Sequence, residues 1–168
     1  MNPKFHNHQA FNRSHDFTQY VTAFDEPAAT ATYGRRYVFA NLEQRSIEMG
    51  TRVDWTLNSR LSFQLYLQPF IATGDYSRYR SLAAARTRDY TPFAFAAADP
   101  DFNFRSARGS AVARWEFRPG SALYVAWNEN REGVAAIGDF RFGRDLRAIP
   151  SSPSHDVFLV KLSYWLPM

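Results

Sequence analysis

The stretch Ser46–Ile71, SIEMGTRVDWTLNSRLSFQLYLQPFI, alternates apolar and polar residues on both sides of a short break. Every second residue from 47 to 57 is apolar or threonine, and after the break every second residue from 61 to 71 is apolar. A period of two residues is that of a β-strand, whose side chains point alternately to opposite faces. The stretch therefore predicts two strands joined by a tight turn, with one apolar and one polar face.

The same alternation recurs at 106–118, 122–131 and 157–166, and a strand-like pattern over 33–44 extends the first strand. We therefore expect strands near 33–57, 61–71, 106–118, 122–131 and 157–166, with a weaker pattern at 16–24. Residues 1–15 are expected to be disordered or extended, and 81–86 could form one or two helical turns. The fold class predicted is an all-β antiparallel meander.

Two turn sequences predict how the strands pair, because the apolar faces of paired strands must coincide. A three-residue loop at 58–60 closes the first hairpin, and a loop of the same length at 119–121 closes the second. The facing pairs expected are Leu57 with Leu61, Trp55 with Phe63, Val53 with Leu65, Phe117 with Leu123, Trp115 with Val125, and Ala113 with Trp127.

The other connections, 72–105 and 132–156, are long and rich in Gly, Pro, Asp, Arg and Ser. Loops of this length count against a compact soluble domain. Short turns at one end and long loops at the other are typical of outer-membrane barrels, whose periplasmic turns are short and whose outer loops are long. The loop lengths therefore indicate the C-terminal part of a transmembrane β-barrel, with 72–105 and 132–156 as its outer loops.

Aromatic residues near the short-turn ends support this interpretation, because an interfacial aromatic belt would lie there. The apolar face would then contact lipid, and the polar face would line a hydrated lumen. The residues expected to face lipid are Ile47, Met49, Val53, Trp55, Leu57, Leu61, Phe63, Leu65, Leu67, Trp115, Phe117, Leu123, Val125, Trp127, Phe158, Val160, Leu162 and Tyr164. Those expected to face the lumen are Glu48, Arg52, Asp54, Gln64, Gln68, Arg108, Arg114, Glu116 and Lys161.

The strand count makes the barrel incomplete. The pattern predicts about five to seven strands, whereas single-chain outer-membrane barrels begin at about 8. A sheet edge left open in lipid exposes unpaired backbone groups. Residues 16–168 are therefore expected to form part of a larger barrel, with outer-membrane lipid and the remaining barrel strands as partners. Because residues 1–17 contain no apolar signal segment, a secretory leader is expected elsewhere in a longer protein.

Composition excludes several classes of function. The chain of 168 residues has no cysteine, which removes disulfides, thiolate metal sites and cysteine nucleophiles. The mean hydropathy of -0.43, with no long apolar run, excludes helical membrane spans. The net charge of +4 comes from scattered arginines rather than from a basic stripe, so no nucleic-acid partner is expected.

Charged residues in the long loops are the candidates for chemistry. Asp99-Pro-Asp101-Phe-Asn103 begins like a calcium loop but lacks the glycine and the final glutamate, so it is better interpreted as a turn. We predict no catalytic, cofactor-binding or metal-ligating residue. A carboxylate pair for glycoside hydrolysis would have to come from Asp75, Asp99, Asp101, Asp139 and Asp145, and no spacing selects two of them. Arginines that could contact lipopolysaccharide phosphates or carbohydrate are Arg78, Arg80, Arg86, Arg88, Arg141, Arg144 and Arg147.

Four stretches resemble one large bacterial family: RRYVFANLEQRS (35–46), LSFQLYLQPFIATGDYS (61–77), DPDFNFRSARGSAVARWEFRPGSALYVAW (99–127) and VFLVKLSYWL (157–166). Members of that family look like outer-membrane proteins of unknown function. They join an N-terminal carbohydrate-binding domain of the family 9 type to a C-terminal barrel. The resemblance implies an outer-membrane barrel domain linked to carbohydrate, and it supplies no catalytic residue.

The expected function is that of a structural or transport-type barrel domain in the bacterial outer membrane, as a fragment of a larger protein linked to carbohydrate binding or uptake. Two alternatives remain open. One is a membrane-associated hydrolase that acts on glycans through its outer loops. The other is a soluble ligand-binding β-barrel or sandwich, which requires the apolar face to point inward.

Overall fold

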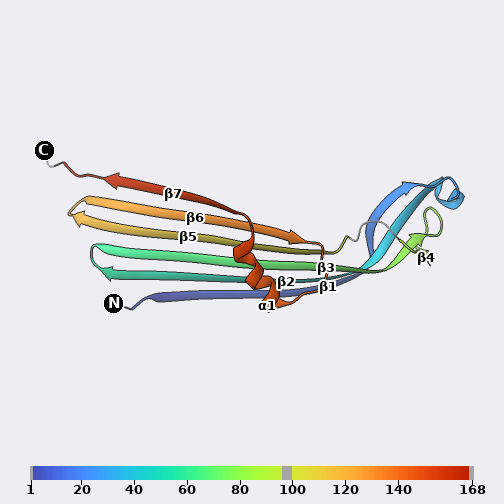
Figure 1. The fold of residues 1–168 in the computed structure, drawn as a ribbon, viewed down its shortest axis with the longest axis horizontal. Coiled ribbons are helices and arrows are strands. Elements are labelled where there is room, and N and C mark those ends of the chain that lie inside the picture. The colour runs from blue at the N-terminus through green and yellow to red at the C-terminus, as the bar shows by residue number, and fades with distance from the viewer. Residues whose placement is uncertain (1, 96–99, 167–168) are drawn as a thin grey trace.

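The computed structural model describes residues 2–95 and 100–166, which form one long antiparallel sheet (Figure 1). The order of the main strands is β1-β2-β3-β5-β6-β7, and β4 pairs with β3. Among the described residues, β1 and β7 each keep one edge without a strand partner, so the sheet is not closed. The predicted all-β antiparallel meander is confirmed. The strands are β1 (Lys4–Asp25), β2 (Arg35–Asn58), β3 (Leu61–Leu82), β4 (Tyr90–Pro92), β5 (Phe102–Arg118), β6 (Ser121–Ala135) and β7 (Ser154–Ser163).

Three short helices accompany the sheet: η1 (Thr30–Thr32), α1 (Phe142–Ala148) and η2 (Ile149–Ser151). The helical turns expected at 81–86 are not formed, because β3 continues to Leu82 and the chain then bends. Both chain ends lie at the end of the sheet that carries the two tight turns, which we call the turn end (Figure 1). The opposite end is called the outer end.

The first hairpin has the predicted register over most of its length. Trp55 faces Phe63, and Val53 faces Leu65. Beside the turn, a β-bulge makes Asn58 the partner of Leu61, in place of the predicted Leu57. The side-chain oxygen of Asn58 accepts a hydrogen bond of 2.8 Å from the N–H of Arg60, which stabilises the turn.

The second hairpin differs from the prediction by two residues. Trp115 faces Leu123 rather than Val125, and Ala113 faces Val125 rather than Trp127, while Phe117 lies in a β-bulge between Glu116 and Arg118. The cause is the position of the turn, which Pro119 and Gly120 form between paired strand ends. Gly120 has φ +76°, as the second central residue of a type II turn after proline requires. A shift of two residues leaves every side chain on its predicted face.

The strands reach further toward the outer end than predicted. β3 continues to Leu82 and β5 begins at Phe102, so both ends of the expected loop 72–105 belong to the sheet. Likewise, β6 continues to Ala135 and β7 spans Ser154–Ser163, so both ends of the expected loop 132–156 also belong to the sheet. At the turn end, most of residues 1–15 also lie in the sheet, as the part of β1 that pairs with β2 from Lys4 onward. These parts lack a regular alternation of apolar and polar residues, so the pattern that marks a strand is not visible in them.

The outer ends of β1, β2 and β3, together with η1 and β4, form a curved projection that we call the arm (Figure 1, right). Register shifts lie between Asp16 and Gln19 in β1 and between Phe39 and Asn41 in β2. Such irregularities bend a strand and increase its twist, which accounts for the curvature where the arm begins.

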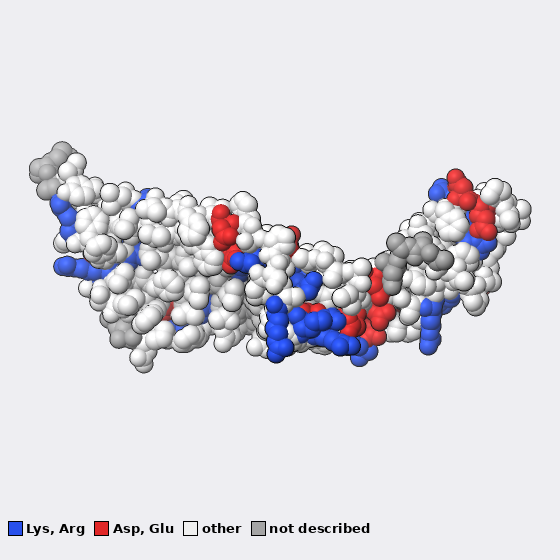
Figure 2. Space-filling view, viewed as in Figure 1, with Lys and Arg blue, Asp and Glu red and all other residues white. Residues whose placement is uncertain are grey.

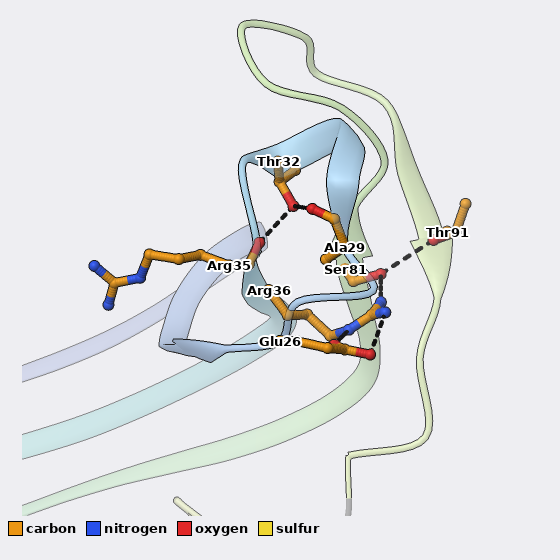
Figure 3. Close-up of polar contacts among 7 residues, drawn as sticks. All are labelled: Glu26, Ala29, Thr32, Arg35, Arg36, Ser81 and Thr91. Carbon is orange, nitrogen blue, oxygen red and sulfur yellow. Dashed lines mark hydrogen bonds and ion pairs between the residues drawn. The ribbon is translucent and has the colours of Figure 1, made fainter.

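Arg36 joins the elements at the tip of the arm (Figure 3). Its guanidinium donates hydrogen bonds to Glu26 Oε1 at 2.9 Å and to Ser81 Oγ at 3.0 Å. Ser81 Oγ in turn lies 3.1 Å from Thr91 Oγ1, and the guanidinium lies 4.7 Å from the centre of the Phe93 ring. The hydrogen bonds from Arg36 lower the pKa of Glu26.

Acidification should loosen the arm. Because the pKa of Glu26 is lowered on folding, its stabilising contribution is complete above its ordinary value of 4.5 and is lost as the pH falls through the lower folded value. Amide hydrogen exchange in 26–36 and 81–91, corrected for its intrinsic pH dependence, should rise below about pH 4.5. The Glu26→Gln variant should lack this step, and a step of equal size in that variant would refute the assignment.

Candidate functional site

The pairing of the strands separates the alternating residues onto two faces. Val53, Leu65, Ala111, Trp127 and Phe158 form one row of facing partners across five strands. Facing residues in an antiparallel sheet share a face, so the predicted lipid-facing residues of the paired rows lie together. We call this side of the sheet the apolar face. All nine residues predicted to face the lumen lie on the opposite side, the polar face.

Much of the apolar face is uncovered. Leu67 on β3 is 45% exposed, Trp115 on β5 is 51% exposed, and Phe158 on β7 is 72% exposed. A contiguous apolar surface of this kind marks a contact with lipid or with another protein surface. The soluble alternative requires this face to point inward, whereas the described residues cover only its outer end.

Residues 136–153, which we call the strap, cover part of the apolar face. The strap carries α1 and η2 across the apolar face between the turn end and the arm (Figure 1). Ile149 packs against Ile71 and Ala107, and all three side chains are buried. Phe140 and Leu146 extend the cluster, which also includes Ile47. The strap therefore covers Ile71 and Ala107 and leaves the rows nearer the turn end open.

Asp145 is fully buried at the centre of the strap. Its Oδ2 accepts a hydrogen bond of 2.9 Å from the backbone N–H of Arg141, and its Oδ1 accepts one of 2.8 Å from Nε of Arg144. Arg144 also donates to Asp139 Oδ1 at 2.6 Å, and this bond lowers the pKa of Asp139. One arginine thus neutralises two carboxylates and folds the strap upon itself.

Three of the five carboxylates considered for hydrolysis have structural contacts. Asp139 and Asp145 share Arg144, and Asp101 accepts a hydrogen bond of 2.6 Å from the backbone N–H of Tyr76. Asp99 lies outside the described residues. Within 2–95 and 100–166, no group of three or more His, Asp or Glu side chains is arranged to hold a metal ion.

Charged residues on the apolar face begin along a slanted line. Counted from the turn end, the first charged side chains on β1 and β2 are Arg13 and Arg45, which face each other. On β6 and β7 the first are Glu129 and Asp156, which also face each other. On β5 the first one beyond Arg118 at the turn is Arg105, between these levels, and on β3 the first is Asp75, which faces Glu43. Figure 2 shows this face, largely white between the turn end and α1, with charged side chains gathered around α1.

The slope of this line follows from the pairing. Glu129 faces Gly109, which pairs with Leu67, and Leu67 faces Thr51. Measured by the facing positions on β2, the charged boundary therefore lies level with Thr51 on β6 and β7. On β1 and β2 it lies level with Arg45. Taken across the whole sheet it moves toward the turn end from β1 to β7, although on β3 it lies further out, level with Glu43.

The polar face is lined by paired charges and by shallow hollows. Arg52 lies 3.0 Å from Asp54, and Gln68 Nε2 donates a hydrogen bond of 2.5 Å to Glu48 Oε1. A hollow of about 240 Å³ lies beside this last pair, and a second of about 180 Å³ follows toward the outer end. Both hollows are lined by Phe70, an apolar residue on the polar face.

The chain belongs to a family described as "Domain of unknown function (DUF5916)". The family matches residues 2–168, which include all seven strands and the strap. No curated protein and no solved structure matches the chain. None of the helices in the described part of the chain is long and apolar enough to cross a membrane.

Two parts of the site were not predicted from the sequence. One is the strap, because α1 has only 7 residues and its apolar residues do not form a recognisable helical pattern. The other is a set of three phenylalanines on the polar face, Phe70, Phe102 and Phe104, which interrupt the alternation. An apolar aromatic residue at a polar position was the signal that could have revealed them.

Asp145→Ala should release the strap from the sheet, because it leaves the N–H of Arg141 and the guanidinium of Arg144 without their buried acceptor. We expect a loss of about 1–3 kcal/mol in local stability. Thermolysin cleavage within 136–153 should accelerate accordingly. Arg147→Ala, at an exposed position of the same helix, is the matched control and should cleave at the wild-type rate. Equal rates in all three proteins would contradict the role of Asp145.

Proposed function

We propose that this chain is a structural or transport-type portion of a β-barrel in a bacterial outer membrane. The apolar face contacts lipid, and the polar face lines a water-filled lumen. The strap lies at the outer boundary of the membrane, where its arginines meet the headgroup layer. The domain works as part of a larger protein linked to carbohydrate binding or uptake.

The height of the uncharged region supports this proposal. On β3 the apolar face carries no charged residue from Leu61 to Ile71. At about 3.3 Å per residue, positions 61 to 71 span roughly 33 Å along the strand. A strand tilted by about 40° reduces this to roughly 25 Å of height, which is the height of the apolar band of an outer-membrane barrel.

The slanted boundary is the observation that carries the proposal. From position 45 to position 51, the boundary moves by roughly 20 Å along the strands at about 3.3 Å per residue. From β1 to β7 it crosses five gaps between paired strands, or roughly 24 Å at about 4.8 Å each. These distances give an angle of about 40° between the boundary and the direction perpendicular to the strands. That angle lies within the tilt of about 35–45° that barrel strands have in a membrane. A planar membrane surface crossing tilted strands produces this slope.

The two free edges support the same proposal. An open edge in lipid leaves backbone N–H and C=O groups unpaired, at a cost of several kcal/mol for each group. The free edges of β1 and β7 therefore need further strands to close a barrel. The resemblance to a bacterial family that joins a barrel to a carbohydrate-binding domain supports the link with carbohydrate.

In the longer protein that supplies the closing strands, Leu65→Arg should prevent insertion into lipid vesicles, because it places a charge near the middle of the apolar face at a cost of about 2–4 kcal/mol. Gln64→Arg is the matched control, since the adjacent side chain points to the polar face, and it should insert as the wild-type chain does. Protection of the strands from externally added protease measures insertion. Normal insertion of Leu65→Arg, or equal failure of both variants, would contradict the proposal.

A further inference from the structure

Three phenylalanines form a stripe on the polar face, which we call the aromatic track: Phe70 on β3, and Phe104 and Phe102 on β5. Phe70 faces Ser106, so the track runs along β5 from the level of position 106 to position 102. At about 3.3 Å per residue this is roughly 13 Å, which is longer than one sugar ring. In the proposed barrel the track lines the lumen and leads toward the outer mouth.

The phenylalanine rings of the aromatic track lie next to one another. The centres of Phe70 and Phe104 lie 6.1 Å apart, with their planes inclined by 58°. Phe102 lies across the backbone of β3 at Gly74, where an added Cβ would stand 2.3 Å from its Cε1. Glycine at position 74 therefore lets the Phe102 ring rest on the sheet.

The groups beside the track are polar and able to form hydrogen bonds, and they include the charged side chains of Glu48, Arg108 and Glu132 in one hollow and of Arg45 in the other. The hollow next to Phe70 and Phe104 also has Gln68, Ser106 and Arg108 in its wall. The hollow next to Phe70 and Phe102 has Ser14, Gln44 and Ser46 in its wall. Amides and hydroxyls both donate and accept, so they match a ligand whose groups do the same.

We infer that the aromatic track binds neutral oligosaccharides. The C–H faces of a sugar ring stack on aromatic rings, and its hydroxyls pair with amide, hydroxyl and guanidinium groups such as those beside the track. A lipid would need an uninterrupted apolar surface, which the polar wall does not offer. A polyanion would need excess positive charge, whereas Glu48 and Glu132 line the same hollow as Arg108. This inference rests on the proposed function, because it takes the polar face to be the wall of the lumen.

The test is calorimetric titration of the full chain with maltohexaose, cellohexaose and chitohexaose. The chain is held in a polyoxyethylene detergent, because a detergent with a sugar headgroup would compete. Saturable binding of at least one of the three is expected. Phe70→Leu and Phe104→Leu should weaken it about tenfold, because leucine preserves apolar volume but removes the stacking surface. Phe104→Tyr should retain binding, and Phe63→Leu on the apolar face is the matched control.

The outcomes separate this inference from the proposal on which it rests. If the chain inserts into vesicles but none of the three sugars binds saturably, the inference is overturned and the barrel proposal stands. Binding that survives both Phe→Leu changes, or that falls equally in Phe63→Leu, also overturns it. If the longer protein that supplies the closing strands does not insert into vesicles, both the inference and the proposed function fail.

Discussion

The antiparallel register between β2 and β3 is the constraint on which the rest of the structure depends. Because side chains alternate along a strand, a shift of one residue would move every apolar side chain to the polar face. The pairing of Val53 with Leu65 prevents this, and β5 continues the same parity through Ala111. The apolar face, the polar face and the slanted boundary all follow from that register.

The strap and the arm extend this arrangement at the outer end. The strap closes the apolar face where the first charged residues appear, and buried Asp145 holds it in its folded form. The arm continues the three longest strands beyond that level and is tied together by Arg36. Between the turns and the strap the apolar face is therefore uncharged, and the outer end carries the polar contacts.

Alternation in the sequence was enough to predict the two faces and most of the first hairpin. Alternation failed where both faces are polar. There Arg13 faces Arg45 on one side of the sheet, and Ser14 faces Gln44 on the other side. Because both pairs are polar, the sequence shows no period of two. The second register was misplaced because a single position of the turn, Pro119-Gly120, decides it. The buried contacts of Asp145 and the ring of Phe102 over Gly74 depend on segments distant in sequence, which alternation does not encode.

The most direct test of the central claim is a spin-label scan of positions 61 to 71 in lipid vesicles, which the absence of cysteine makes straightforward. Each position is replaced singly by cysteine and labelled, and the collision rates with oxygen and with a water-soluble nickel complex are compared. Contact of the apolar face with lipid predicts high oxygen access at odd positions and high nickel access at even positions, with a period of two. Odd positions shielded from both reagents, or a signal without that period, would contradict contact between the apolar face and lipid.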